Sequence, residues 1–192
     1  MSTNQGGTPL PATERSAATG DLRQFRSSRT LRNGTGIVIR AVRPDDKERF
    51  RIAFSKLQSE TVFRRFFGYK EELSKAELEQ ATNVDFDRVV ALVATVGSAE
   101  QEAIVAGARY IGYGPPSKMA EVAFTVEEDY QGLGIGTALL RELIAIARTK
   151  GIAQFTAEVL AENRSMLAVF AHSGLQMREQ RTSEGIHLTL SL

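Results

Sequence analysis

The apolar positions of this chain follow two periods, which divide it into predicted strands and helices. Apolar residues that run together or alternate indicate strands, and apolar residues spaced three and four apart indicate helices. The strands predicted in this way are Ile37–Arg40, Val89–Val96, Ala103–Tyr110, Met119–Val126, Ala153–Leu160, Leu175–Arg181 and Ile186–Leu190. Helices are predicted to begin near Pro44, Ser59, Ser74, the glycines at 132–136 and Asn163. Asp45 and Asp46 place acids at the start of the first helix, and Ser74 with Glu77 forms a capping box. This order of strands and helices predicts an α/β layer fold.

The first 28 residues differ from the rest, because they are rich in Ser, Thr, Gly, Pro, Arg and Gln and show little apolar periodicity. Such a segment buries too little apolar surface to fold, so a flexible tail is expected over residues 1–28, with a short helix around Asp21–Phe25 as an alternative for part of it. A single domain is expected over residues 29–192. Within it, the strands between 89 and 126 are expected to form an antiparallel meander, and the next strand, helix and strand a parallel βαβ unit.

A glycine-rich turn lies where the predicted strand Met119–Val126 passes into the following helix. From Val126 to Thr137 it reads V-E-E-D-Y-Q-G-L-G-I-G-T, with glycines at 132, 134 and 136. Glycine permits positive φ and lets a ligand approach the backbone closely. Because the unpaired N–H groups of a helix N-terminus attract anions, the turn predicts a phosphate-binding loop. The alternative is that the glycines only form a tight entry into the helix.

Composition narrows the chemistry that this loop could serve. The 24 basic and 23 acidic residues give a formal net charge of +1, which gives no argument for a nucleic-acid or membrane partner. The chain has no cysteine and only two histidines, so thiolate chemistry is excluded and a metal centre is not expected. No apolar run approaches the roughly 18 residues of a membrane span, and the N-terminal residues contain no apolar signal core. A cytoplasmic protein is therefore expected.

Spacing excludes two common nucleotide loops. A Walker A loop needs Lys and then Ser or Thr after its last glycine, but Gly136 is followed by Thr137 and Ala138. The dinucleotide fingerprint would need glycine at position 137. The run Gln131–Gly136, with Val126 five residues before the Gln, instead resembles the pyrophosphate loop of the GNAT acetyltransferase superfamily.

The resemblance covers about residues 36–190 of the chain. Asn163–Leu175 is similar to the family's later helix, and Ile39–Asp46 resembles its usual opening. More narrowly, Leu31–Phe67, with Arg64-Arg65-Phe66-Phe67-Gly68 at its end, resembles the Pat-type bacterial protein-lysine acetyltransferases. The resemblance implies a mixed, mostly antiparallel sheet of about six to seven strands flanked by about four helices.

The resemblance also implies which residues bind acetyl-CoA as co-substrate. Backbone amides of the glycine loop would hold the CoA pyrophosphate, and the strand before the loop would pair with pantetheine. The implied cofactor-binding residues are Phe124, Thr125, Val126, Gln131, Gly132, Leu133, Gly134, Ile135, Gly136, Thr137, Asn163 and Phe170. For Asn163, a role as a plain helix N-cap is an equal and compatible alternative. No metal is implied.

Glu121 is the candidate catalytic residue. A free lysine has a pKa of about 10.4, so its amine has to lose a proton before it attacks a thioester, and a general base is useful. Alternation along the strand puts Glu121 on the face opposite Val122 and Phe124. Pat-type enzymes are similar in placing their catalytic Glu within A-E-V-A-F. The alternative is a solvent-exposed strand acid.

The acid that protonates the leaving thiolate stays open. GNAT enzymes often have a Tyr in the later helix, and the matching position here is Phe170. Ser165, Tyr130 or water could substitute. The acids at 127–129 are expected to serve solubility or the helix dipole. Arg64 and Arg65 lie beside an aromatic cluster expected in the core, and they could contact an acidic protein substrate.

Together these features predict an acetyl-CoA-dependent N-acetyltransferase that works by direct transfer, with Glu121 as general base. The Pat-type resemblance implies a protein lysine as acceptor, for example on an acyl-CoA synthetase. A small amine or antibiotic is the rival acceptor. A non-catalytic acyl-CoA-binding sensor is the alternative from another class, and its only support is the Phe at position 170.

Overall fold

The computed structural model describes residues 20–98, 101–183 and 185–192. Its centre is one eight-stranded sheet in the order β1-β2-β3-β4-β5-β6-β8-β7, and only the pair β5–β6 is parallel. The strands are β1 (Arg26–Thr30), β2 (Gly36–Ala41), β3 (Val89–Val96), β4 (Ala103–Gly112), β5 (Met119–Val126), β6 (Gln154–Val159), β7 (Gln176–Arg181) and β8 (Ile186–Ser191). The mixed, mostly antiparallel sheet is confirmed, with one or two more strands than expected.

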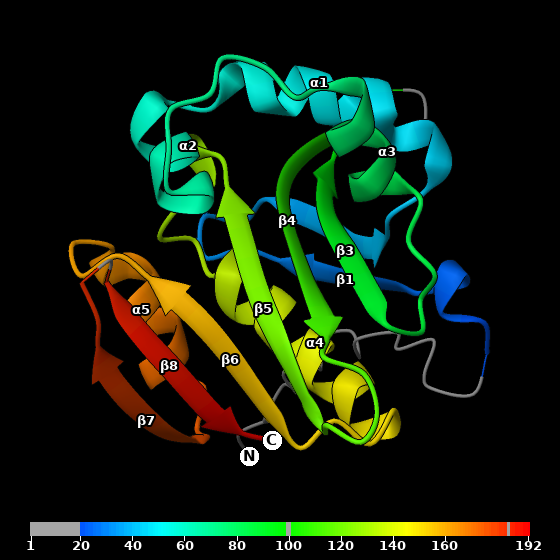
Figure 1. The fold of residues 1–192 in the computed structure, drawn as a ribbon. Coiled ribbons are helices and arrows are strands. Elements are labelled where there is room, and N and C mark those ends of the chain that lie inside the picture. The colour runs from blue at the N-terminus through cyan, green and yellow to red at the C-terminus, as the bar shows by residue number, and fades with distance from the viewer. Residues whose placement is uncertain (1–19, 99–100, 184) are drawn as a thin grey trace, which may run out of the picture.

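Helices cover both faces of this sheet (Figure 1). Within the described residues there are five α-helices and three labelled 3-10 turns: α1 (Lys47–Lys56), α2 (Ser59–Phe66), α3 (Lys75–Thr82), α4 (Ile135–Thr149), α5 (Arg164–Ala171), η1 (Leu22–Gln24), η2 (Pro44–Asp46) and η4 (Glu128–Tyr130). Helices α1–α3 lie on the side of β3, β4 and β5 opposite to α4 and α5. No helix in the described ranges is long and apolar enough to cross a membrane.

The elements form where the apolar pattern places them. Strand β3 is a continuous run of small and branched residues, because helices cover it on both sides and six of its eight residues are buried. Helix α4 packs with a stripe that includes Leu139, Leu143 and Ala147, all fully buried. Each such leucine contributes on the order of 1.5–3 kcal/mol by leaving water. The predicted capping box of α3 is also present, since the Ser74 and Glu77 side chains each accept a backbone N–H from the other residue.

The short helix expected around Asp21–Phe25 is present as η1, whereas the expectation of a flexible tail is wrong for residues 26–28. Those residues form most of β1, which pairs antiparallel with β2. Ser27 and Arg29 both donate hydrogen bonds to the carboxylate of Glu142 on α4. Periodicity missed this strand because it is fastened by a polar contact to α4 and not by alternating apolar residues. The part of the tail prediction that concerns residues 1–19 lies outside the described residues.

A buried arginine joins β2 to the helical layer. The Arg40 guanidinium donates two hydrogen bonds of 2.7 Å to the carboxylate of Asp46 and bonds of 2.9 and 2.8 Å to that of Glu102. Arg40 is 1% exposed and Asp46 is 0% exposed. Asp46, which the sequence marked only as an acid at a helix start, is thus the buried partner of a cation from β2.

Candidate active site

The sheet opens where β5 and β6 separate. Their parallel pairing covers three residue pairs, from Met119 with Gln154 to Glu121 with Thr156, although both strands continue for several residues. Figure 1 shows the two strands meeting at one end and diverging toward the other. Beyond Glu121, the edge of β5 that faces β6 therefore has no partner strand among the described residues. A ligand with amide groups could pair with this edge like an added strand.

A cavity of about 810 Å³ occupies this gap. Its walls come from the open edges of β5 and β6, from the glycine loop, and from α2, α4 and α5. The predicted site residues that line it are Glu121, Phe124, Thr125, Val126, Gln131, Gly132, Gly134, Ile135, Gly136, Thr137, Asn163 and Phe170. Leu133 is the exception, because its side chain packs against the hydrophobic core. The fold thus gathers residues from four separate stretches of sequence, at 32, 61–67, 121–141 and 157–172, around one cavity.

The three glycines of the loop serve two different purposes. Gly132 and Gly134 have φ of +72° and +97°, values that residues other than glycine rarely adopt. Gly136 lies close to α5, since a Cβ there would come within 3.3 Å of a Val169 methyl group. Within the part of the chain that the structure describes, no side chain caps the N-terminus of α4 at Gly134. The first N–H groups of α4 therefore stay available to an anion.

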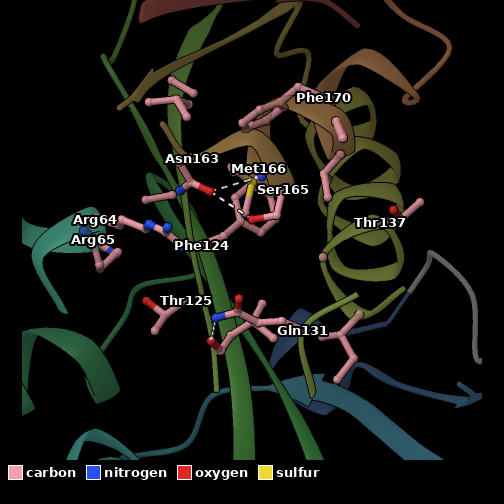
Figure 2. A pocket seen from close by; sticks show the side chains of 18 of the residues that line it. Arg64, Arg65, Phe124, Thr125, Gln131, Thr137, Asn163, Ser165, Met166 and Phe170 are labelled. Atoms are coloured by element: carbon pink, nitrogen blue, oxygen red, sulfur yellow. Dashed lines mark hydrogen bonds between the residues drawn. The ribbon is translucent and has the colours of Figure 1, made fainter. Parts of the chain in front are cut away.

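The glycine loop is tied to helix α2. The Gln131 side-chain amide donates to the Val126 carbonyl at 3.0 Å and to the Thr61 hydroxyl at 3.3 Å, the first of which Figure 2 shows. The Glu128 carboxylate accepts the backbone N–H of Gln58, the residue before α2, at 3.0 Å. Glu128 therefore holds the start of α2, which is a more specific role than the solubility expected from the sequence.

Helix α5 closes the other side of the cavity. The side-chain carbonyl of Asn163 accepts the Met166 N–H at 3.2 Å and the Ser165 hydroxyl at 3.0 Å (Figure 2). The N-cap role of Asn163 is thereby confirmed, and its side-chain carbonyl is used within the helix. Phe170 is 1% exposed and meets the ring of Phe124 edge-on, with centroids 5.8 Å apart. Phe170 is thus a packed wall of the cavity.

Glu121 lies at the point where β5 and β6 part. It is exposed, and its neighbours Val122 and Phe124 are buried on the other face of β5, as the alternation predicts. The described residues offer its carboxylate no hydrogen bond or ion pair. An exposed, unpaired carboxylate at the narrow end of a cavity is open to a substrate, as a general base has to be.

Two arginines that line the cavity were not predicted as site residues from the sequence. Arg32, in the turn between β1 and β2, donates from its guanidinium to the Gly132 carbonyl and from its backbone N–H to the Leu133 carbonyl, both at 3.4 Å. Arg141 projects from α4, and both arginines line the cavity. Arg32 is 100 residues from Gly132 in the chain, so no local pattern could have joined them.

Comparisons with known proteins agree with this geometry. The model of the acetyltransferase (GNAT) family matches residues 55–175. Acetyltransferase Pat from Mycolicibacterium smegmatis is 37% identical over 75% of this chain and 42% of its own length. Acetyltransferase PA5475 from Pseudomonas aeruginosa is 35% identical over 71% of this chain and 73% of its own. The crystal structure of the GNAT domain of S. lividans PAT superposes with a TM-score of 0.80 at 32% identity, covering 87% of this chain and 97% of that one.

The fold and the cavity together define an acyltransferase domain. The chain belongs to the acetyltransferase (GNAT) family, whose members use acetyl-CoA as co-substrate. Mycobacterium smegmatis RimJ, solved in complex with CoA-disulfide, shares the fold with a TM-score of 0.64 at 16% identity. The chain spans less than half the length of the M. smegmatis Pat protein that it matches.

Replacing Arg32 by Ala is expected to weaken CoA binding about fivefold, because an exposed cation beside a phosphate site contributes roughly 1 kcal/mol. The weakening should shrink as salt rises, since salt screens an exposed charge. Titration calorimetry with CoA at low and high salt measures both effects. Arg178→Ala, on the exposed face of β7, is the charge-matched control. An unchanged CoA affinity in Arg32→Ala would show that Arg32 only supports the loop.

Proposed function

We propose that this chain transfers the acetyl group of acetyl-CoA to an amine, and that the acceptor is a lysine side chain of a protein. The observation that carries the proposal is the position of Glu121 at the point where β5 and β6 part. Strand β5 carries Glu121 as the candidate general base. The unpaired edge of β5 begins just beyond Glu121, and the glycine loop follows the end of the strand. Transfer requires a base and a bound thioester close together.

The residues around the cavity suit the parts of acetyl-CoA. The glycine loop and the uncapped start of α4 suit its pyrophosphate, and Arg32 adds positive charge there. The unpaired edge at Phe124–Val126 suits the amides of pantetheine. Acetyl-CoA supplies an activated acyl carbon. Bound in this way, it directs its thioester toward the end of the cavity where Glu121 lies.

In the proposed reaction Glu121 takes a proton from the acceptor amine, directly or through water. The amine nitrogen then bonds to the acetyl carbon and releases its second proton to water, and the carbon–sulfur bond breaks as CoA leaves as a thiolate. A backbone N–H of the Phe124–Val126 strand would stabilise the oxyanion. The thiolate takes its proton from Ser165, Tyr130 or water, since both side chains line the cavity and Phe170 has no proton to donate.

A protein acceptor is supported by the surface next to the cavity. Phe66, Phe67 and Tyr69, at the end of α2 and just after it, are 38%, 40% and 84% exposed. Phe67 also lines the cavity. Exposed aromatic side chains are typical of protein–protein interfaces and less so of a surface that meets only water. The resemblance to Pat-type enzymes supports the same class of acceptor. We also propose that the protein acts in the cytoplasm.

Incubation of the purified protein with radiolabelled acetyl-CoA tests the proposal. The acceptors would be a purified acyl-CoA synthetase, a whole-protein extract, and a panel of small amines that includes aminoglycosides. Label on lysine residues of a protein is the expected result. Label only on small amines would overturn the lysine acceptor and retain the transferase. No label on any acceptor, with CoA still bound, would favour the non-catalytic alternative.

A further inference from the structure

A second cavity, of about 310 Å³, lies beside the first on the α1–α3 side of the sheet. Its floor consists of small residues of three neighbouring strands, which include Ala91, Gly107 and Ala123. Helix α1, with the aromatic rings of Phe50 and Phe54, and helix α2 cover the opposite side of the cavity. The cavity exists because small side chains in the sheet lie beneath large ones in the helices. Its walls are mostly apolar, so the few charged groups in them stand out.

Arg65 and Arg109 are two of these charged groups. Arg65, in the last turn of α2, lines both cavities, whereas Arg109, on β4, lines the second cavity only. Figure 2 shows Arg65 on the α2 side of the first cavity. On β4, Arg109 is registered between Ala91 of β3 and Ala123 of β5. Its nearest neighbours in the sheet therefore offer no side chain to pair with it.

Neither guanidinium has a hydrogen bond or an ion pair with any of the described residues. The chain treats other arginines of this region differently. Arg40 is saturated by two carboxylates, and Arg64, next to Arg65, pairs with Glu60. The guanidinium carbon of Arg65 lies 5.1 Å from the centroid of the Phe66 ring, which offers no hydrogen-bond acceptor of the strength of a carboxylate. Leaving a partly buried guanidinium unpaired is costly, so the unused donors indicate a missing partner.

The electrostatics of the two arginines agree with this. Burial, and after it the charge of Arg109, lower the pKa of Arg65 to about 10, and Glu121 opposes the shift. Arg65 therefore remains charged at neutral pH. Glu121 forms no ion pair with either arginine, and Glu77, which also lines the second cavity, is paired with Lys70. An additional anion would therefore be attracted to the junction of the two cavities.

We propose that Arg65 and Arg109 bind a carboxylate of the acceptor, held in the second cavity while the reacting amine faces Glu121. A guanidinium matches a carboxylate with two parallel hydrogen bonds, and the apolar walls fit the carbon chain that carries it. Glu127 lines the same cavity but lies four residues beyond Ala123 along β5, about 13 Å away. Since Glu127 would repel an anion, the carboxylate belongs at the arginine end.

This inference rests on the proposed function and specifies it. Because the acceptor there is a protein, the carboxylate is that of an Asp or Glu side chain close to the reacting lysine. A free amino acid carries the same chemistry in its α-carboxylate. The two sources are separated by the acceptors used in the test.

The first part of the test measures binding without turnover. Titration calorimetry compares 4-phenylbutyrate with its neutral amide in the wild type, in Arg65→Gln, in Arg109→Gln and in the control Arg51→Gln. Arg51 lies on α1, lines neither cavity and pairs with Glu48. The carboxylate is expected to bind roughly tenfold to hundredfold more tightly than the amide in the wild type and control. This preference for the carboxylate over the amide should disappear in Arg65→Gln and in Arg109→Gln. Equal binding of acid and amide in the wild type would overturn the proposal.

The second part identifies the source of the carboxylate. Single-lysine peptides with Glu at each position within four residues of the lysine are compared with matched Gln peptides, and lysine is compared with lysine amide. A lower KM for at least one Glu peptide, abolished in Arg65→Gln and Arg109→Gln, is expected. A preference only for free lysine would assign the site to an amino acid. A preference for Glu peptides that remains in both Arg65→Gln and Arg109→Gln would overturn the proposal that these arginines bind the carboxylate. Transfer to no acceptor, with the acid still bound selectively, would refute the proposed function alone.

Thermal melting of each variant checks that it is folded. Arg65→Lys serves as a second variant if Arg65→Gln melts early, because Lys keeps the charge and loses the planar fork. The acid-over-amide preference of Arg65→Lys is expected to fall between those of the wild type and Arg109→Gln. A preference in a folded Arg65→Lys equal to the wild type's would contradict a paired, bidentate role for Arg65.

Discussion

Replacing Glu121 by Gln is expected to lower kcat for acetyl transfer roughly 100- to 1,000-fold and to leave the affinity for CoA unchanged. A positioned general base contributes on this scale, and the amide of Gln cannot accept the proton of an ammonium. Glu121 has neither a hydrogen bond nor an ion pair with another described residue, and its side chain is exposed. The substitution therefore removes the proposed chemistry without removing a contact that stabilises the fold.

Steady-state kinetics with the best acceptor, together with calorimetric titration of CoA, measure the two quantities separately. Glu162→Gln, in the exposed turn between β6 and α5, is a matched control outside the cavity and should behave as the wild type does. Unchanged turnover in Glu121→Gln would remove Glu121 from the mechanism. Lost turnover with retained CoA binding would rule out a purely non-catalytic sensor.

Replacing Arg40 by Ala is expected to lower the free energy of unfolding by about 3–5 kcal/mol, the usual effect of removing one partner of a buried ion pair. The substitution would leave the carboxylate of Asp46 buried at 0% exposure without its main cation. It would also remove the hydrogen bonds between Arg40 and Glu102. Urea unfolding followed by circular dichroism measures the change. Arg51→Ala, which breaks an exposed pair on α1, should change stability little.

The same cluster predicts an acid-dependent loss of stability. The hydrogen bond from Arg40 lowers the pKa of Glu102 from its ordinary 4.5 to about 2. Because the folded pKa is the lower one, the stabilisation is present above about pH 4.5 and is lost as the pH falls toward 2. The Arg40→Ala variant should show a flatter dependence over that range. An equally steep dependence would assign the acid sensitivity to other carboxylates.

Much of the candidate site could be predicted from sequence because it is local. Strand β5, the glycine loop and the start of α4 follow one another in the chain, so their spacing alone indicated a phosphate site. The face of Glu121 also followed from alternation, because a strand turns its side chains by a fixed period. The N-cap at Asn163 and the capping box at Ser74 depend on contacts within a few residues, and both were confirmed.

The remaining features depend on contacts between distant parts of the chain. Strand β1 was missed because its stabilising partner, Glu142, is more than 100 residues away. Arg32 reaches the glycine loop only because β1 and β2 turn beside it, and Glu128 caps a helix that precedes it by some 70 residues. Leu133 was assigned to the site because the backbone amides of the loop were expected to bind the pyrophosphate, and its partly buried side chain packs against the core.

The sequence by itself thus determined the kind of ligand and the position of the proposed base, since both lie on one continuous strand–loop–helix segment. The tertiary structure decided what surrounds that segment. Only the fold shows that β5 and β6 stop pairing at Glu121, and that two arginines from α2 and β4 line a second cavity without a partner among the described residues. The physical reason is that periodicity along the chain shows which face of a strand or helix a side chain lies on. Tertiary packing decides which residues from distant parts of the chain lie next to that side chain.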